Sequence, residues 1–212
     1  MIKVPPRLSP TRLDEGEEEE REKNEGMKPD QPMSPVQQAL FKARTVLIFG
    51  EIDMKVAERV SGQLLAYAAE GDEDIRVIIN SPGGHVESGD TIHDLIRFVV
   101  PRVRMIGTGW VASAGAHIFL GARKENRYCL PNTRFLLHQP MGGVHGPASD
   151  ITIEAEEILK MHERINRIIA RETGQTFEKV VADTDRNFWM SAEEAKAYGL
   201  VNKVVKSADE VA

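Results

Sequence analysis

Ser113 supplies the hydroxyl group in GWVASAGAH, residues 109–117, a stretch made almost wholly of small or apolar residues. Apolar runs lie on both sides, so we expect a strand that ends just before Ser113 and a buried helix that begins near it. A serine at such a junction can cap the helix through its side-chain oxygen. It can also lie at the carboxyl edge of the sheet, where ligands bind in α/β folds, and act there as a nucleophile.

Two further segments favour the nucleophile. INSPGGHV ends a strand with Gly83 and Gly84, whose backbone can turn sharply and present bare N–H groups to a ligand. RFLLHQP ends another strand with His138, 25 positions after Ser113, where a general base could stand. Taken alone, the Pro-Gly-Gly segment is an ordinary turn and His138 an ordinary structural residue. Together with the free N–H groups of the helix start, they favour a nucleophilic serine with a general base and an oxyanion site.

The other histidines are weaker candidates. His117 lies one helical turn after Ser113, but its apolar neighbours predict core packing. His85, His93, His145 and His162 lack a paired metal-ligand spacing such as H-E-x-x-H, so we expect no metal site.

Strand and helix patterns alternate from about Leu40 onward, which predicts an α/β fold with a largely parallel sheet. The predicted strands are residues 45–50, 76–81, 102–109, 126–131, 133–138 and 200–205. The predicted helices are residues 54–70, 86–100, 149–172 and 193–199, together with the helix near Ser113. Ser191 and Glu194 have the spacing of a capping box before the last helix.

Composition narrows the possible classes of function. The chain has 212 residues, 41% of them hydrophobic, which suits one core, and its net charge of −6 argues against nucleic-acid and membrane-surface partners. No apolar run approaches the roughly 20 residues of a membrane span. The single cysteine, Cys129, cannot form an internal disulfide and fits a reducing cytoplasm.

The predicted domain organisation has three parts. Residues 1–38 are acidic and rich in proline, so we expect a disordered tail. Residues 39–206 form the folded domain, and residues 207–212 form a short C-terminal tail.

Four blocks in this order, INSPGG, GTGWVASAGA, RYCLPNTRFLLHQPMGG and MSAEEAKAYGLVNKV, resemble the ClpP family of serine peptidases over about residues 40–205. The resemblance implies a spiral of β–β–α units, shared with the crotonases, and a protruding handle helix at residues 149–172. It also implies two stacked seven-membered rings around a chamber, into which an AAA+ unfoldase delivers polypeptides. This chain has no G-x-x-x-x-G-K-[ST] phosphate loop, so any nucleotide hydrolysis belongs to that partner.

By the same resemblance, Ser113 is the nucleophile and His138 the general base, and the amides of Gly84 and Ala114 form the oxyanion hole. The implied mechanism uses no metal or organic cofactor. The third triad member falls 49 positions after His138, at Asn187, where the family usually has aspartate.

Two further sets of residues are implied by the resemblance. Asp185 and Arg186 match a pair that the family uses for contacts between rings. Ile78 and Phe98 match apolar residues of the unfoldase-docking groove, while Arg76 stands where an aromatic residue is usual.

The leading interpretation is a serine endopeptidase subunit of a Clp-like chambered protease. The alternative is a weakly active or non-catalytic structural subunit of a mixed ring with an active ClpP paralogue, which Asn187 and Arg76 favour. A crotonase acting on acyl-CoA could use the same fold, but it would not need the serine and the histidine at these positions.

Overall fold

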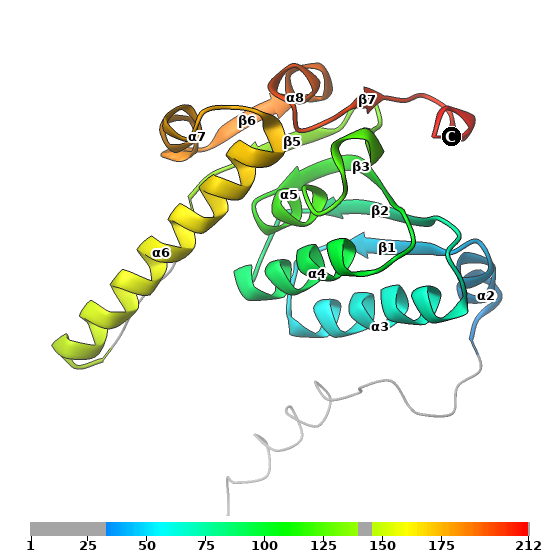
Figure 1. Ribbon diagram of the computed structural model, residues 1–212, viewed down its shortest axis with the longest axis horizontal. Helices are drawn as coiled ribbons and strands as arrows, with labels where there is room; N and C mark the ends of the chain where they lie inside the picture. Colours follow the sequence, from blue (N-terminus) through cyan, green and yellow to red (C-terminus); the bar gives the residue numbers. More distant parts are fainter. Residues whose placement is uncertain (1–32, 140–145, 212) are drawn as a thin grey trace, which may run out of the picture. The chain divides into compact units, whose positions relative to one another are not determined.

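The computed structural model describes residues 33–139 and 146–211 (Figure 1). The expected tail at residues 1–32 therefore lies outside the described residues. Helix α2, Pro35–Lys42, begins inside the segment 1–38 that we expected to be tail, so residues 35–38 are helical, while the boundary after residue 38 stays a prediction. Its start has a clear cause, because Ser34 and Gln37 exchange backbone-to-side-chain hydrogen bonds of 2.8 and 3.2 Å across the first turn. This reciprocal capping, with proline at the first helical position, is a helix-start signal that the sequence carries.

Two compact units divide the chain after Gln38. In the second unit, the described residues form one seven-stranded sheet whose central order is β1-β2-β3-β4-β7, with β5 paired to β3 and β6 paired to β5. The strands are β1 Thr45–Phe49, β2 Ile75–Ser81, β3 Val103–Ala112, β4 Arg127–Cys129, β5 Arg134–Leu137, β6 Phe188–Ser191 and β7 Lys203–Val204. The β5–β6 pair is antiparallel and the other pairs are parallel. The predicted α/β class with a largely parallel sheet is confirmed.

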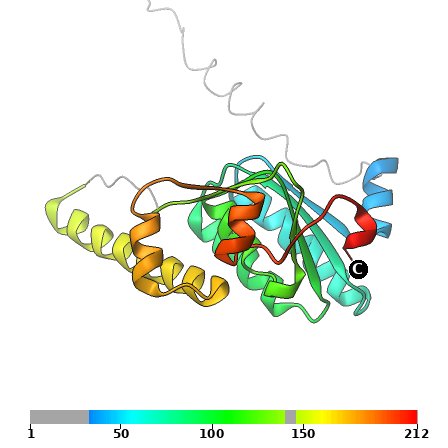
Figure 2. The ribbon, with the colours of Figure 1, turned by 90° about the horizontal axis from the view of Figure 1, so that it is seen from above.

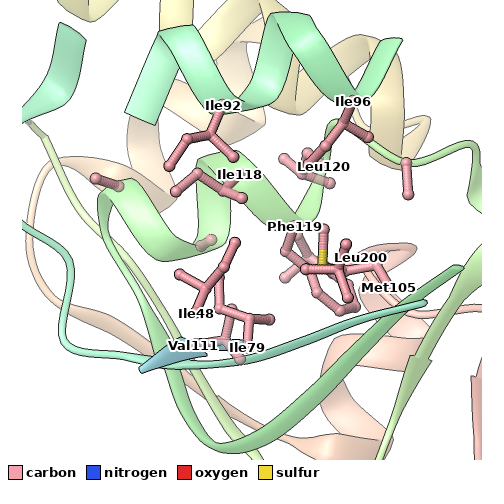
Figure 3. Packing of buried hydrophobic residues seen from close by; sticks show 14 of the residues in the cluster. Ile48, Ile79, Ile92, Ile96, Met105, Val111, Ile118, Phe119, Leu120 and Leu200 are labelled. Carbon is pink, nitrogen blue, oxygen red and sulfur yellow. The ribbon is translucent and has the colours of Figure 1, made fainter. Parts of the chain in front are cut away.

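Helices cover the sheet and enclose the core. They are α3 Met54–Glu70, α4 Val86–Phe98, α5 Ala114–Phe119, α6 Ala148–Thr173, α7 Phe177–Thr184 and α8 Ala192–Tyr198. Figure 1 shows α3, α4 and α5 together beside strands β1 to β3. Figure 3 shows the resulting core, in which Ile92 and Ile96 of α4 and Ile118 and Phe119 of α5 lie close to buried residues of the strands.

Helix α6 differs from the others in its surroundings. Figures 1 and 2 show that its first half runs out beyond the sheet, while its last turns return beside α7 and β5. Ile165 and Ile169, near its end, are buried in the core, whereas Ile153 and Leu159 are exposed by 59% and 66%. In the described part of the chain, no helix is long and apolar enough to cross a membrane.

Besides α2, helix α7 and strand β6 were not expected from the sequence. Helix α7 is capped by Thr176, whose hydroxyl accepts the Lys179 N–H at 3.2 Å, a local signal that the sequence carries. Strand β6 has only four residues, and it exists because it pairs with β5. The capping box of Ser191 and Glu194 is confirmed at the start of α8.

The C-terminal residues fold back onto the outer face of the sheet. A short 3-10 helix, Ala208–Glu210, precedes Val211, which is only 7% exposed and packs in a small cluster with Ile106 and Tyr128. Arg104 of β3 donates a hydrogen bond of 2.7 Å to the Val211 carbonyl. Val211 is therefore packed against the domain and hydrogen-bonded to it, whereas residues 207–209 are exposed.

Candidate active site

Ser113 occupies the junction between β3 and α5 in a strained backbone conformation. Its φ of 54° and ψ of −121° lie where residues other than glycine are rarely found. A hydrogen bond of 3.0 Å from its backbone N–H to the Leu136 carbonyl ties the junction to β5. The side chain makes no capping hydrogen bond, although the residue stands at the cap position of α5. The Ser113 hydroxyl therefore does not cap α5. A strained strand-to-helix turn of this kind is typical of an exposed nucleophile.

The glycine turn after β2 packs directly against Ser113. A Cβ atom at Gly83 would lie 2.6 Å from the Ser113 Cβ, and one at Gly84 would lie 2.2 Å from the Ile52 carbonyl oxygen. Their φ angles of 103° and 145° also favour glycine. Within the described residues, the backbone N–H groups of Gly84 and Ala114 have no hydrogen-bond acceptor, so both can donate to a ligand.

His138 and Asn187 face each other across the β5–β6 pair. The antiparallel register pairs Leu137 with Phe188, and one further step of that register sets His138 opposite Asn187. The Asn187 side chain is near enough to the imidazole to affect its pKa. Burial lowers the pKa of His138 below its ordinary value, and the interaction with Asn187 offsets part of that effect. An upward contribution means that this interaction favours the protonated ring.

Ser113 and His138 line the same small cavity, whose volume is about 30 Å³. The other lining residues are Val86, Ala114, His117, Leu137, Ile165 and Ile169. A space of that size holds about one water molecule. The Ser113 hydroxyl makes no hydrogen bond to any residue in the described ranges. Ser113 and His138 therefore line one cavity, but they are not hydrogen-bonded to each other.

The loop that carries Asn187 is fastened to the residue after His138 and to α6. Gln139 donates its backbone N–H to the Thr184 carbonyl at 2.9 Å and its side-chain amide to the Asp185 carbonyl at 3.0 Å. The buried Thr184 hydroxyl donates to the Asn166 side chain of α6 at 3.1 Å. These bonds keep the two strand ends that carry His138 and Asn187 together.

The neighbouring aspartates have other partners. The Asp183 carboxylate pairs with the Lys179 ammonium at 2.6 Å and accepts the Tyr198 hydroxyl at 2.9 Å. Asp185 lies 3.8 Å from the Arg186 guanidinium, and both side chains are mostly exposed. Neither aspartate contributes to the pKa shift of His138, whereas Asn187, which lies opposite it in the register, does.

His117 is buried, as its neighbours predicted, but its contacts were not expected. Its Nε2 lies 2.8 Å from an Asp90 carboxylate oxygen, and its ring stacks on the ring of His93 with centroids 4.4 Å apart. Because Asp90 and His93 lie more than 20 positions before His117 on another helix, no local pattern could have revealed this contact. Among the described residues, no group of three histidine, cysteine, aspartate or glutamate side chains could hold a metal ion.

The residues expected at a docking groove are not brought together within one chain. Arg76 and Ile78 lie on the outer face of β2, where Ile78 is aligned with Ile106 of β3. Phe98 is 75% exposed at the end of α4, a helix that packs on the opposite, inner face. The sequence also did not show that Val211 covers part of the outer face.

Comparisons with known proteins agree with this geometry. The model of the family described as Clp protease matches residues 29–208. Proteolytic subunit 2 of the ATP-dependent Clp protease of Gluconobacter oxydans is 60% identical over 210 residues, which cover 97% of this chain and 94% of that protein. Proteolytic subunit 3 of Rhizobium meliloti is 61% identical over 172 residues, covering 81% and 88% respectively.

Solved structures of ClpP1 from Listeria monocytogenes are similar to the whole folded part. The protein itself superposes with a TM-score of 0.76, and a mutant in which an asparagine is replaced by aspartate superposes with 0.79. Both are 53% identical to this chain and cover 84% of it and 99% of their own length.

Proposed function

This chain belongs to the Clp protease family as a proteolytic subunit, a serine peptidase with the α/β ClpP fold, and we propose that Ser113, His138 and Asn187 are its catalytic triad. The observation that carries the assignment is the shared cavity, which both Ser113 and His138 line. The Ser113 hydroxyl makes no capping hydrogen bond, and Asn187 lies opposite His138 in the β5–β6 register. No other histidine in the described ranges lines that cavity except His117, which faces Asp90.

The proposed reaction is acyl transfer to serine followed by hydrolysis. The Ser113 oxygen attacks a peptide carbonyl carbon while His138 takes the hydroxyl proton. The N–H groups of Gly84 and Ala114 donate hydrogen bonds to the oxyanion that forms. His138 then gives its proton to the leaving amine, the C–N bond breaks, and a water molecule, activated by the same histidine, hydrolyses the ester and releases the serine.

Asn187 sets an upper limit on the rate of this reaction. Its amide oxygen can orient the imidazole, but it brings no negative charge to stabilise the imidazolium that forms during attack. We therefore assign the chain a low intrinsic peptidase activity.

The proposed assembly is two stacked heptameric rings. The first half of α6 supports it, because Ile151, Ile153 and Leu159 expose apolar surface that another subunit could cover. The exposed charges of Asp185 and Arg186 suit a polar contact between rings. Sedimentation of the purified chain as a monomer across a wide concentration range would refute this assembly.

The proposed partners are an AAA+ unfoldase and the polypeptides that it delivers in the cytoplasm. Arg76 and Ile78 are proposed for docking because they share the outer face of β2, where Arg76 is exposed and Ile78 is partly buried. Phe98 is proposed because its ring is largely exposed. Since Phe98 and Ile78 face opposite sides of the sheet in one chain, the groove would need residues from two adjacent subunits.

A second candidate function is a structural subunit that completes a mixed ring with an active paralogue. Two observations favour it: the neutral Asn187, and a Ser113 hydroxyl that is not hydrogen-bonded to His138.

A labelling experiment separates the two candidates. A fluorophosphonate probe should label the wild-type chain at Ser113, and Ser113→Ala should abolish both labelling and hydrolysis of a short fluorogenic peptide. Loss of a single hydroxyl that makes no capping bond should leave assembly intact. The matched control is Ser61→Ala on α3, whose buried hydroxyl has no hydrogen-bond partner and should be dispensable. Unchanged peptide hydrolysis by Ser113→Ala would disprove the assignment, and an unlabelled wild-type chain would favour the structural subunit.

A further inference from the structure

A single carboxylate ties three helices together beneath the cavity. Asp90 of α4 lies between His117 of α5, whose Nε2 is 2.8 Å from one carboxylate oxygen, and Arg164 of α6, whose guanidinium donates to the other. His93 of α4 stacks face to face on the His117 ring, with planes 10° apart. His93 and His117 are only 2% and 4% exposed, so the two stacked imidazole rings are buried.

The Asp90 carboxylate remains charged in these surroundings. Burial alone would raise its pKa, but the close His117 ring and the positive charge of Arg164 lower the pKa overall. The Asp90–Arg164 pair is partly exposed, and ion pairs in contact with water contribute little to stability. Stability therefore does not explain why the core has polar residues at this place.

The cluster is connected to the nucleophile through one turn of helix. The backbone N–H of His117 donates to the Ser113 carbonyl at 3.1 Å, and the His117 side chain lines the cavity together with Ser113 and His138. Because α5 has only six residues, a tilt at His117 must reach Ser113. The strained backbone of Ser113 also needs firm support from its surroundings to persist.

We propose that Arg164, Asp90 and His117 form a positioning relay through which α6 holds Ser113 in its attacking orientation. The inference rests on the proposed role of Ser113 as nucleophile. None of the three side chains needs to touch the substrate: Arg164 orients Asp90, Asp90 orients His117, and His117 fixes the helical turn that begins at Ser113. The relay makes the reactivity of the serine depend on where α6 lies.

The first test compares two arginines of the same helix. Arg164→Gln breaks the link to Asp90, whereas the control, Arg167→Gln, removes an arginine that pairs with Glu163 one turn away and stacks on Phe177 of α7. Because small displacements of reacting groups reduce rates strongly, we expect Arg164→Gln to lower kcat on a short fluorogenic peptide by about tenfold. The KM should stay within about twofold, since the substrate contacts are unchanged.

Two further measurements distinguish positioning from general damage. The rate of fluorophosphonate labelling at Ser113, which needs no peptide binding, should fall in parallel with kcat in Arg164→Gln. Arg164→Lys keeps the positive charge and should recover at least about half of the lost labelling rate. Sedimentation and thermal unfolding of each variant should match the wild-type chain.

A second variant approaches the relay from α4. Asp90→Asn keeps the shape of the side chain but removes the charge shared by His117 and Arg164, so its loss of kcat should equal or exceed that of Arg164→Gln. Combined, the two substitutions should lose little more than Asp90→Asn alone, because residues in one network are not additive. If Arg164→Gln prevents assembly, Asp90→Asn decides the matter.

Equal kcat and labelling rate in Arg164→Gln, Asp90→Asn and Arg167→Gln would overturn the relay, as would a raised KM with unchanged kcat. Neither result would affect the proposed triad if Ser113→Ala remains inactive. Full activity of Ser113→Ala would instead remove the proposed function, whatever the relay variants show.

Discussion

Replacing Asn187 with aspartate tests the proposed triad most directly. Asn187 lies opposite His138 in the β5–β6 register, and its side chain raises the pKa of the imidazole. Aspartate has nearly the same shape and would place a negative charge at the same point. The two strand ends are held together by the hydrogen bonds of Gln139 to Thr184 and Asp185, so the exchange should not disturb the backbone.

The expected gain in rate follows from the charge that His138 acquires during attack. At about 4 Å and an effective dielectric constant of about 20, an imidazolium and a carboxylate attract by about 4 kcal/mol. Each 1.36 kcal/mol is tenfold in rate, so this attraction corresponds to about 10³. The half-buried site makes the new carboxylate lose part of its hydration, which subtracts from the gain. We therefore expect Asn187→Asp to raise kcat by about 10²- to 10³-fold, below the ~10⁴ lost in the opposite exchange in another serine protease.

The assay is hydrolysis of a short fluorogenic peptide by the assembled full chain, with Asn187→Ala measured beside it. Alanine removes the acceptor for the imidazole, so Asn187→Ala should be slower than the wild-type chain. Asp183→Ala is the matched control and should not change kcat strongly, because Asp183 is occupied by Lys179 and Tyr198. No gain with Asn187→Asp, combined with a large loss in Asp183→Ala, would show that the third residue lies elsewhere.

Three other predictions concern residues with different roles. A Cβ atom at Gly84 would lie 2.2 Å from a backbone oxygen. Gly84→Ala should therefore lower kcat at least about tenfold and lower the unfolding temperature. The control, Gly62→Ala, has open space around the new Cβ atom and should do neither. Burial lowers the pKa of His138, and the neutral ring is the base, so kcat/KM should fall at acid pH with a midpoint below pH 6.5. Asn187→Asp should move this midpoint to higher pH. A wild-type midpoint at or above pH 6.5 would contradict the assignment of His138 as the base. Burial raises the pKa of Cys129 to about 12, so iodoacetamide at about pH 8 should label it only after unfolding in guanidinium, and fast labelling of the native chain would be inconsistent with its burial.

Local patterns in the sequence predicted much of the fold. Alternating strand and helix signals led to the α/β class, and the apolar run before Ser113 led to a strand followed by a helix, as β3 and α5 confirm. These predictions succeed because the apolar period of an element and its capping residues lie within a few positions of each other. The starts of α2 and α7 were missed although Ser34 and Thr176 carry the same kind of local signal.

The residue types of the site could also be chosen from the sequence. A serine at a strand-to-helix junction, a glycine turn and a histidine at a strand end were selected because their chemistry suits acyl transfer. The resemblance to a family then pointed to Asn187, which no pattern of periodicity or spacing could have found. Its role as the third residue stays a prediction.

The amino-acid sequence by itself thus determined which residues could react. Reactivity depends on the chemical type of a side chain and on its position at the end of a strand or helix, and both can be read from the sequence. Only the tertiary structure decided how they meet: the register of β5 and β6 sets Asn187 against His138, and the packing of three helices sets Asp90 against His117 and Arg164. These contacts join positions 27 to 74 apart in the chain, so they depend on how whole elements pack and leave no trace in the residues near either partner.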